Sequence, residues 1–210
     1  PTRDSLLYDG PITLSVSAML QARAFDASEE PIFLPSNLAA GTFVAASSGV
    51  RNVTSDLPLL VLDGVANLAN AGGNSLTPMN VVMFEPNKAN GLAALDGDLR
   101  YMTYVGRGGA RDRGSSTARQ AKPNMTFETW GPTGTNENHD ADVDWLGLSP
   151  ESDWVLYAPF GIDHTLVRNP LAFDLSNEIG GWASAYRHVE VYLDGGREAG
   201  DGVIDADDYM

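Results

Sequence analysis

The sequence predicts an α+β protein built mainly of short strands, with one main helix. Its 210 residues are 43% hydrophobic and 9% aromatic, which is enough to build a substantial core. The 22 glycines and 12 prolines indicate many turns and few long helices. Strand-like apolar runs recur along the whole chain, whereas the spacing of an amphipathic helix occurs in one place. We therefore expect mixed β-structure around a single main helix.

Residues 1–46 are expected to form the end of a small β-sandwich. Three short strand-like runs alternate there with turn residues such as Asp9 and Gly10. The runs are residues 11–16, 19–25 and 42–44. The stretch DGPITLSVSAMLQARAFD resembles the C-terminal half of the chitobiase-type, fibronectin-like repeat of secreted multidomain proteins, in which the module is mainly a spacer. Residues 47–56 are small and polar, so we expect them to be a linker.

A second domain is expected from residue 57 to residue 210. It opens with residues 57–62, a continuous apolar run typical of a buried strand. Further strand-like runs follow, several of them alternating in polarity. They are residues 80–85, 99–105, 123–130, 154–158 and 187–193. The segments between them that we expect to be loops or turns are residues 66–77, 136–144 and 159–164.

The main helix is expected at residues 165–179. Apolar residues recur there every four positions, which places them on one face of a helix. They are Val167, Leu171, Leu175 and Ile179. Pro170 lies in the first turn, where proline is tolerated, and Gly180 follows the last periodic residue as a helix terminator.

One basic, glycine-rich stretch, residues 107–122, stands out in an otherwise acidic chain. The formal net charge is −15, yet five of the 13 Lys and Arg residues fall here, interleaved with Gly108, Gly109, Gly114 and two serines. Glycines allow backbone N–H groups to converge, and guanidinium groups match phosphate oxygens, so the stretch is a candidate anion site. On its own it fits a solvated loop better, and it contains neither a P-loop nor a dinucleotide-binding pattern.

Two acidic segments are candidate metal sites. Residues 136–144 contain His139 and three aspartates, and the tail after residue 194 contains several carboxylates. Neither has the glycine and glutamate spacing of a calcium-binding loop, so we expect a solvated loop and a hairpin loop and nominate no metal ligand.

The amino-acid composition of the chain indicates which kinds of binding partner are not expected. The acidic balance argues against nucleic acid as the main partner, because phosphate backbones require a broad basic face. No run of about 18 apolar residues is present, so no membrane span is expected. The chain has no cysteine, begins with Pro1 and ends directly after a loop, so we expect an internal piece of a longer protein.

From residue 57 onward the order of elements resembles the spore-coat CotH family, whose members are called CotH kinase-like. The resemblance rests on the Arg-Gly-Ser-Ser block, a following lysine, and the Asp-Trp-Val-Leu-Tyr-Ala-Pro segment that leads to Arg168-Asn169. The matching stretches are LPLLVLD at 57–63, RGSSTARQAKPNMTFETW at 113–130, LGLSPESDWVLYAPFGIDHTLVRNPLAFDLSNEIG at 146–180 and RHVEVYLDG at 187–195.

The resemblance implies the N-terminal part of an atypical protein-kinase-like domain, truncated at its C-terminus. It also implies ATP and Mg²⁺ as cofactors, and phosphoryl transfer needs cations around the triphosphate. The implied phosphate contacts are Arg113, Ser115, Ser116, Lys122 and Arg168. Asp163 is an alternative partner for Arg168. Where the family has PKKS this chain has AKPN, and the family's acidic residues lie beyond Met210, so the catalytic residues stay unknown.

Two functions follow as hypotheses. In the first, the parent protein is a secreted or surface Ser/Thr protein kinase that acts on a protein substrate, and this fragment alone is inactive. In the second, the domain is a non-catalytic coat or cell-surface scaffold that binds coat or surface proteins. Both imply an extracellular location or one on the cell or spore surface. Carbohydrate binding by residues 1–46 has little support, because that part contains no tryptophan.

Overall fold

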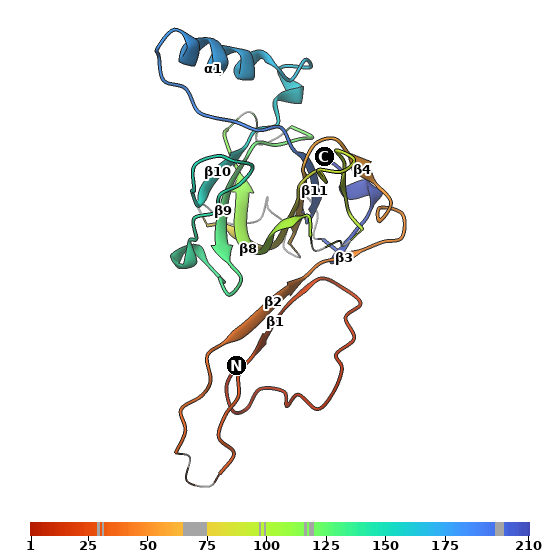
Figure 1. Ribbon diagram of the computed structural model, residues 1–210, viewed down its shortest axis with the longest axis vertical. Helices are drawn as coiled ribbons and strands as arrows, with labels where there is room; N and C mark the ends of the chain where they lie inside the picture. The colour runs from red at the N-terminus through yellow and green to blue at the C-terminus, as the bar shows by residue number, and fades with distance from the viewer. Residues whose placement is uncertain are drawn as a thin grey trace.

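A six-stranded sheet forms the centre of the computed structural model (Figure 1). The structure describes residues 1–28, 30, 32–64, 75–96, 98, 100–115, 117, 120–195 and 200–210. The strands of the sheet are β5 (Leu59–Asp63), β6 (Thr77–Phe84), β8 (Met102–Asp112), β9 (Met125–Gly131), β10 (Asp153–Leu156) and β11 (Glu190–Asp194). Their order is β10-β9-β8-β6-β5-β11, antiparallel throughout except for the parallel pair β11 and β5.

All six predicted strands of the second domain overlap these six, and the run at 99–105 overlaps only the start of β8. The runs at 57–62, 80–85, 123–130, 154–158 and 187–193 match β5, β6, β9, β10 and β11. The α+β class is therefore supported by the observed mixture of strands with one α-helix. The predicted loop at 66–77 falls mostly on residues outside the described part of the chain.

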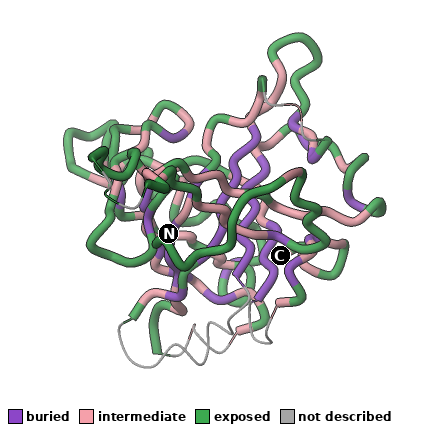
Figure 2. The backbone as a smooth tube through the Cα atoms, turned by 90° about the horizontal axis from the view of Figure 1, so that it is seen from below, coloured by how far each residue is buried: buried purple, intermediate pink, exposed green. Residues whose placement is uncertain are grey.

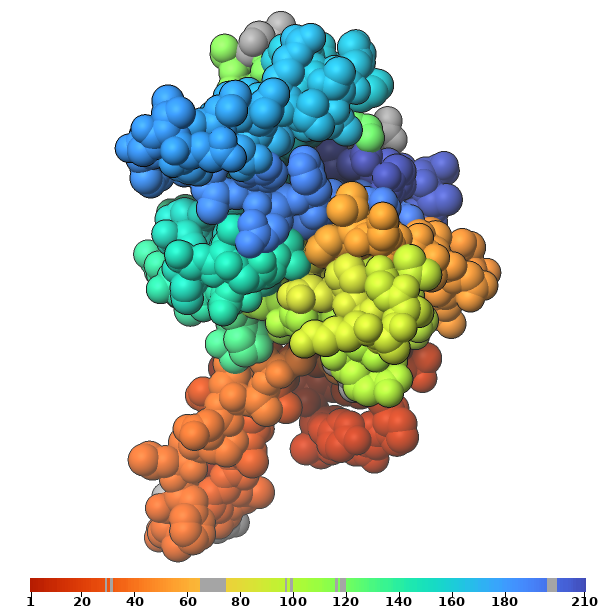
Figure 3. All heavy atoms as spheres, turned by 45° about the horizontal axis from the view of Figure 1, so that its top comes forward, coloured from red at the N-terminus to blue at the C-terminus, as the bar shows by residue number. Residues whose placement is uncertain are grey.

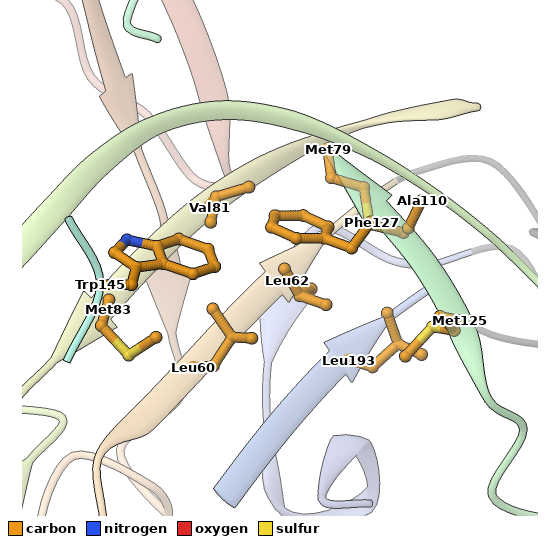
Figure 4. Packing of buried hydrophobic residues seen from close by; sticks show 10 residues of the cluster. All are labelled: Leu60, Leu62, Met79, Val81, Met83, Ala110, Met125, Phe127, Trp145 and Leu193. Atoms are coloured by element: carbon orange, nitrogen blue, oxygen red, sulfur yellow. The ribbon is translucent and has the colours of Figure 1, made fainter. Parts of the chain in front are cut away.

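The central strands are buried on both faces. Every residue of β5 is buried, and successive residues belong to two different clusters on opposite sides of the sheet. One cluster gathers around Phe127 and Trp145 (Figure 4). The other contains Val61, Val82 and Tyr192, together with Ile204 from the C-terminal segment. The continuous apolar run predicted for this strand follows from this two-sided burial.

Trp145 lies at the centre of the first cluster. Its ring stacks on Phe127 and on Trp154, with centroid distances of 5.6 and 5.3 Å, and meets Tyr104 edge-on at 5.4 Å. Trp145 follows β9 by a long connection, so these contacts hold that connection against the sheet. Burial of such large rings contributes strongly to core stability.

Smaller paired segments surround the sheet. The two-stranded ribbon of β1 (Ala18–Ala22) and β2 (Ala39–Phe43) is antiparallel. The parallel pair is β3 (Ala45–Ala46) with β12 (Val203–Ile204), and the short antiparallel pair is β4 (Thr54–Ser55) with β7 (Ala93–Ala94). Single 3₁₀ turns are η3 (Glu137–His139), η4 (Pro159–Gly161) and η5 (Ala206–Asp208).

The N-terminal region contains one ribbon of two strands. The runs predicted at 19–25 and 42–44 overlap β1 and β2, but residues 11–16, predicted as a strand, form none. The ribbon and its loops project away from the sheet (Figures 1 and 3) and are largely exposed (Figure 2). The β-sandwich interpretation and the division at residues 46 and 57 stay predictions.

The predicted helix exists as α1 (Arg168–Glu178), but its apolar face is not buried. No residue of α1 is buried, and Leu171 is 57% exposed. Figure 1 shows the reason, because the helix stands beyond one end of the sheet. The four-residue repeat therefore predicted the helix correctly, and the apolar residues on that face stay exposed.

The first part of the basic stretch is a β-strand, although the sequence predicted a loop. We expected the strand to end at Val105 and a flexible loop to begin at Arg107, but β8 continues to Asp112. The glycines inside β8 allow close packing instead of a phosphate-binding turn. A Cβ atom on Gly109 would lie 2.3 Å from the Trp130 ring, and one on Gly108 would lie 2.5 Å from the carbonyl oxygen of Glu128.

Replacing Trp145 by alanine should lower the free energy of unfolding by about 3–5 kcal/mol, because it removes the central ring of the aromatic cluster. Trp182, which is 86% exposed, is the matched control, and Trp182→Ala should change stability by about 0.5 kcal/mol or less. Urea unfolding followed by far-ultraviolet circular dichroism measures both. Equal losses for the two variants would contradict the assigned core.

Gly109→Ala should destabilise the protein by roughly 1–3 kcal/mol, because the added methyl group would collide with the Trp130 ring. Gly10→Ala is the control, since a Cβ atom there meets no other atom within 4 Å. Thermal melts of the two variants test the packing role of the glycine. A neutral Gly109→Ala variant would remove this explanation for the glycines of β8.

Candidate functional site

The connection between β8 and β9 carries most of the predicted phosphate contacts. The N–H of Arg113 donates to the carbonyl of Asn124 at 2.7 Å, which closes the connection at its base. Gly114 has a φ of +90°, the left-handed conformation that favours glycine. Arg113 and Ser115 are exposed on this connection, whereas Ser116 lies outside the described residues. Two of the predicted contacts therefore face solvent.

Lys122 lies between two aromatic rings near the end of this connection. Its Nζ is 5.9 Å from the centroid of the Phe160 ring and 5.6 Å from that of the Tyr209 ring. Both are cation–π contacts, which orient the side chain without neutralising its charge. No carboxylate of the described residues forms an ion pair with Lys122. The ammonium group is thus held in place and keeps its charge available for an anion.

Arg168 already has the partner that the sequence suggested. Its Nε lies 3.5 Å from Oδ1 of Asp163, and its backbone N–H donates to Oδ2 of the same residue at 2.9 Å. Asp163 also accepts hydrogen bonds from the hydroxyl and the N–H of Thr165. The Thr165 hydroxyl, followed by the N–H groups of Arg168 and Thr165, lowers the pKa of Asp163 below its usual value. Asp163 thereby caps the first turn of α1.

The segment that precedes α1 brings Lys122 and Arg168 into one region. Phe160, which contacts Lys122, also meets the His164 ring edge-on at 4.8 Å, and Asp163 lies between them in sequence. Gln120 packs against the same segment, since a Cβ atom on Gly161 would overlap its side chain. Within the described residues, no interaction connects the side chains of Arg113 or Ser115 to either cation.

A second polar group, which the sequence did not predict, crosses the sheet from the end of β5 through the middle of β6 to the middle of β8. Asp63, Asn80 and Arg107 are register neighbours on the same face. Asn80 donates to Asp63 at 2.8 Å, and Arg107 donates to the Asn80 carbonyl oxygen. Burial lowers the pKa of Arg107, partly opposed by the charge of Asp63. The Arg107 side chain therefore takes part in hydrogen bonding across the sheet and does not belong to an exposed anion-binding loop.

A short repeat in the sequence could have indicated that Asp63 has a counterpart on another strand. The tripeptide Leu-Asp-Gly occurs at residues 62–64 and again at residues 193–195. The structure pairs the two in register, with Asp63 opposite Asp194. The repeat is too short to be significant alone, and its meaning depends on the pairing of β5 with β11.

The acidic segments do not form a metal centre in the part of the chain that the structure describes. No group of three or more His, Asp or Glu side chains is arranged there to hold a metal ion. Residues 136–144 are a largely exposed loop, as predicted, with η3 capped by the side chain of Asn136. None of the described helices has the length and apolarity needed to cross a membrane.

Asp163→Ala should lower the melting temperature at least twice as much as Arg168→Ala. The first variant removes the acceptor for three donors, whereas the second removes an ion pair whose Arg168 side chain is 72% exposed. Because the pKa of Asp163 is lowered, its contribution is present above the usual aspartate pKa and is lost as the pH falls further. The gap between wild type and Asp163→Ala should narrow only below about pH 4. Similar losses for both variants would instead point to the ion pair.

The sequence was compared with known protein families, curated proteins and solved structures. Residues 110–204 match the family model CotH, described as CotH kinase protein. The comparisons with curated proteins and with solved structures gave no match. Residues 57–109 and the N-terminal ribbon lie outside the matched range, so their proposed resemblances stay predictions. All five predicted phosphate contacts lie inside it. Over residues 110–204, a little under half of its length, the chain is similar to the CotH kinase protein family.

Proposed function

We propose that the parent of this chain is a secreted or surface Ser/Thr protein kinase that uses ATP and Mg²⁺, with Lys122 as the main phosphate contact among the described residues. The proposal rests on the environment of Lys122, which lies within the matched residues 110–204. Two aromatic rings orient its ammonium group, and no described carboxylate pairs with it. A desolvated or oriented ammonium group is a common phosphate ligand in phosphoryl transfer.

The described residues provide ligands for the phosphate groups of Mg-ATP but no complete set of ligands for its metal ion. Lys122 offers an unpaired positive charge, and the exposed Arg113 and Ser115 add donors on the same connection. Arg168 is already paired with Asp163, so we expect it to contribute less. For Mg²⁺ the described residues provide no group of three ligating side chains, and we assign none. When bound, Mg-ATP would supply the phosphoryl group and neutralise its developing charge.

The chain's own residues would bind and orient the nucleotide in this proposal. The Phe160 and Tyr209 rings would keep Lys122 in one orientation, so little side-chain entropy is lost on binding. Asp163 would fix the start of α1 and hold the segment from residue 159 against the connection that carries Lys122. Catalytic residues stay unassigned, and the fragment alone is expected to be inactive.

The second candidate is a non-catalytic coat or surface scaffold. It is favoured by the exposed apolar face of α1 and the segments on either side, which no described element covers. The exposed apolar residues there are Ile162, Leu166, Val167, Leu171, Leu175, Ile179 and Trp182. Exposed apolar patches of this kind mark interaction surfaces. In either candidate, the proposed partners are protein substrates or coat and surface proteins, at an extracellular, cell-surface or spore-surface location.

Mg-ATP should raise the melting temperature of the wild-type chain if it binds the folded state. Lys122→Met, which keeps the apolar stem but loses the charge, should weaken Mg-ATP binding roughly tenfold or more, because a charge-assisted contact contributes about 1.5–3 kcal/mol. Lys88→Met is a matched control, because Lys88 and Lys122 are the two lysines of the chain. Isothermal titration calorimetry gives the dissociation constants.

The outcomes separate the candidates. No binding of Mg-ATP by the wild type would leave the scaffold as the better function. Binding that Lys122→Met does not weaken would remove Lys122 from the site. Phosphoryl transfer itself is tested with the parent protein, radiolabelled ATP, Mg²⁺ and a casein-like substrate, and absence of transfer would contradict the kinase activity.

A further inference from the structure

Two aspartates at the ends of neighbouring parallel strands face each other inside the molecule. Asp63 ends β5, Asp194 ends β11, and the two are register partners. Since paired residues of parallel strands point to the same face, both carboxylates lie on the side of Tyr192 and Val61. We refer to Asp63 and Asp194 as the acid pair.

Both carboxylates are withdrawn from water. Asp63 is 1% exposed and Asp194 is 4% exposed. One oxygen of Asp63 accepts from Asn80, whereas its Oδ1 is buried with no hydrogen-bond partner. The oxygens of Asp194 accept from the backbone N–H groups of Asp201 and Gly202, at 3.1 and 2.7 Å. An unpartnered buried carboxylate oxygen is costly, so the Asp63 oxygen requires a donor.

No described cation neutralises the acid pair. Arg107 exerts a charge effect on Asp63, but it donates its hydrogen bond to Asn80. The other described charged groups that act on the pair are carboxylates. Asp208 of η5 acts on both aspartates, and Asp201 and Asp205 in turn act on Asp208. Two ionised carboxylates would therefore repel each other in a site of low dielectric constant.

The direction of the pKa shifts of Asp194 and Asp208 agrees with this geometry. Burial, together with Asp63 and Asp208, raises the pKa of Asp194 to about 6, although the N–H of Gly202 opposes the rise. Burial also raises the pKa of Asp208, with Asp205, Asp201 and Asp63 adding to the effect. Asp194 therefore takes up a proton near pH 6, well above the pH at which an ordinary aspartate does.

We propose that Asp63 and Asp194 share one proton, and that this proton controls how firmly the segment at residues 201–204 is held to the sheet. In the protonated state, the carboxyl group of Asp194 donates to Oδ1 of Asp63 and satisfies its missing partner. The proton comes from bulk water and returns to it when the pH rises. In the fully ionised state, repulsion between the two carboxylates destabilises this placement of the Asp194 side chain and loosens its hold on residues 201–204.

Asp194 is the anchor for the junction with the N-terminal part of the chain. It accepts from the N–H of Gly202, and the carbonyl of Gly202 accepts from the N–H of Ser17 at 2.7 Å. The next residues, Val203 and Ile204, form β12, which pairs with β3. There is little free space here, because a Cβ atom on Gly200 would lie 2.2 Å from the Asp194 carboxylate. Movement of Asp194 would therefore reach the N-terminal ribbon through these hydrogen bonds.

The direction of the pH effect follows from the raised pKa. A group that binds a proton more tightly in the folded state stabilises the fold fully below its unfolded pKa. That contribution is lost as the pH rises through about 6. The acid pair should therefore hold the junction firmly in mildly acidic solution and loosen it at neutral and alkaline pH.

The main test compares wild type with Asp194→Asn, whose amide imitates the protonated acid. Urea unfolding between pH 4.5 and pH 7.5 gives the two unfolding equilibrium constants. Their ratio should change roughly 25-fold over this range, because only the wild type loses a proton. Asp142→Asn, at an exposed position, is the control and should run parallel to the wild type.

A second measurement follows the junction itself. Amide hydrogen exchange at Gly202 and Ser17, corrected for the intrinsic pH dependence, should accelerate in the wild type between pH 5 and pH 7.5 but not in Asp194→Asn. If that variant does not fold, Asp63→Asn provides the amide donor from the other strand. Carbon-13 NMR titration of the Asp194 carboxyl group in the wild type needs no variant.

Three results would overturn the proposal. The first is a pH-independent ratio between wild type and Asp194→Asn. The second is a carboxyl titration of Asp194 at the usual value for aspartate. The third is a rise in wild-type melting temperature with added Ca²⁺ or Mg²⁺ at pH 7.5 that Asp194→Asn lacks, since it would show a bridging cation in place of a shared proton.

Discussion

Burial of the central strands on both faces is the constraint on which the rest of this structure depends. β5 contributes Leu60 and Leu62 to one cluster and Leu59 and Val61 to the other, so any connection that crosses either face must bring its own apolar side chains. Trp145 does this for one face, and Val50 and Ile204 do it for the other. Segments far apart in the sequence are therefore brought together by packing on the two faces of the sheet.

The same constraint explains the glycine-rich composition of β8. This strand lies between β6 and β9, and bulky rings from the latter strand occupy the space next to its backbone. Gly108 and Gly109 leave room for Phe127 and Trp130, and any side chain in their place would displace them. Glycine is usually unfavourable within a strand, but here the lost propensity is offset by close packing of aromatic side chains.

Charge is distributed in two separate regions with different physical behaviour. At the edge near η4 and α1, Lys122 and Arg168 are accessible to solvent and lie within the CotH region. Across the sheet, the acid pair is buried and Arg107 is half-buried, and the raised pKa of Asp194 links its protonation to folding. The C-terminal segment lies between the two regions, because Tyr209 contacts Lys122 and directly follows Asp208, which acts on Asp194.

The sequence by itself determined most of the secondary structure and the similarity to the CotH family. Strand-like runs identified β5, β6, β9, β10, β11 and the start of β8, and a four-residue repeat identified α1. The motif around Arg168 indicated the similarity to the CotH family, and Asp163 was named as a partner of Arg168. These features depend on residues close together in the chain. The tertiary structure alone decided that β8 extends through the glycines, that the apolar face of α1 stays exposed, and that Asp63 meets Asp194. Each of these depends on which distant side chains occupy the neighbouring space, and local periodicity contains no information about that.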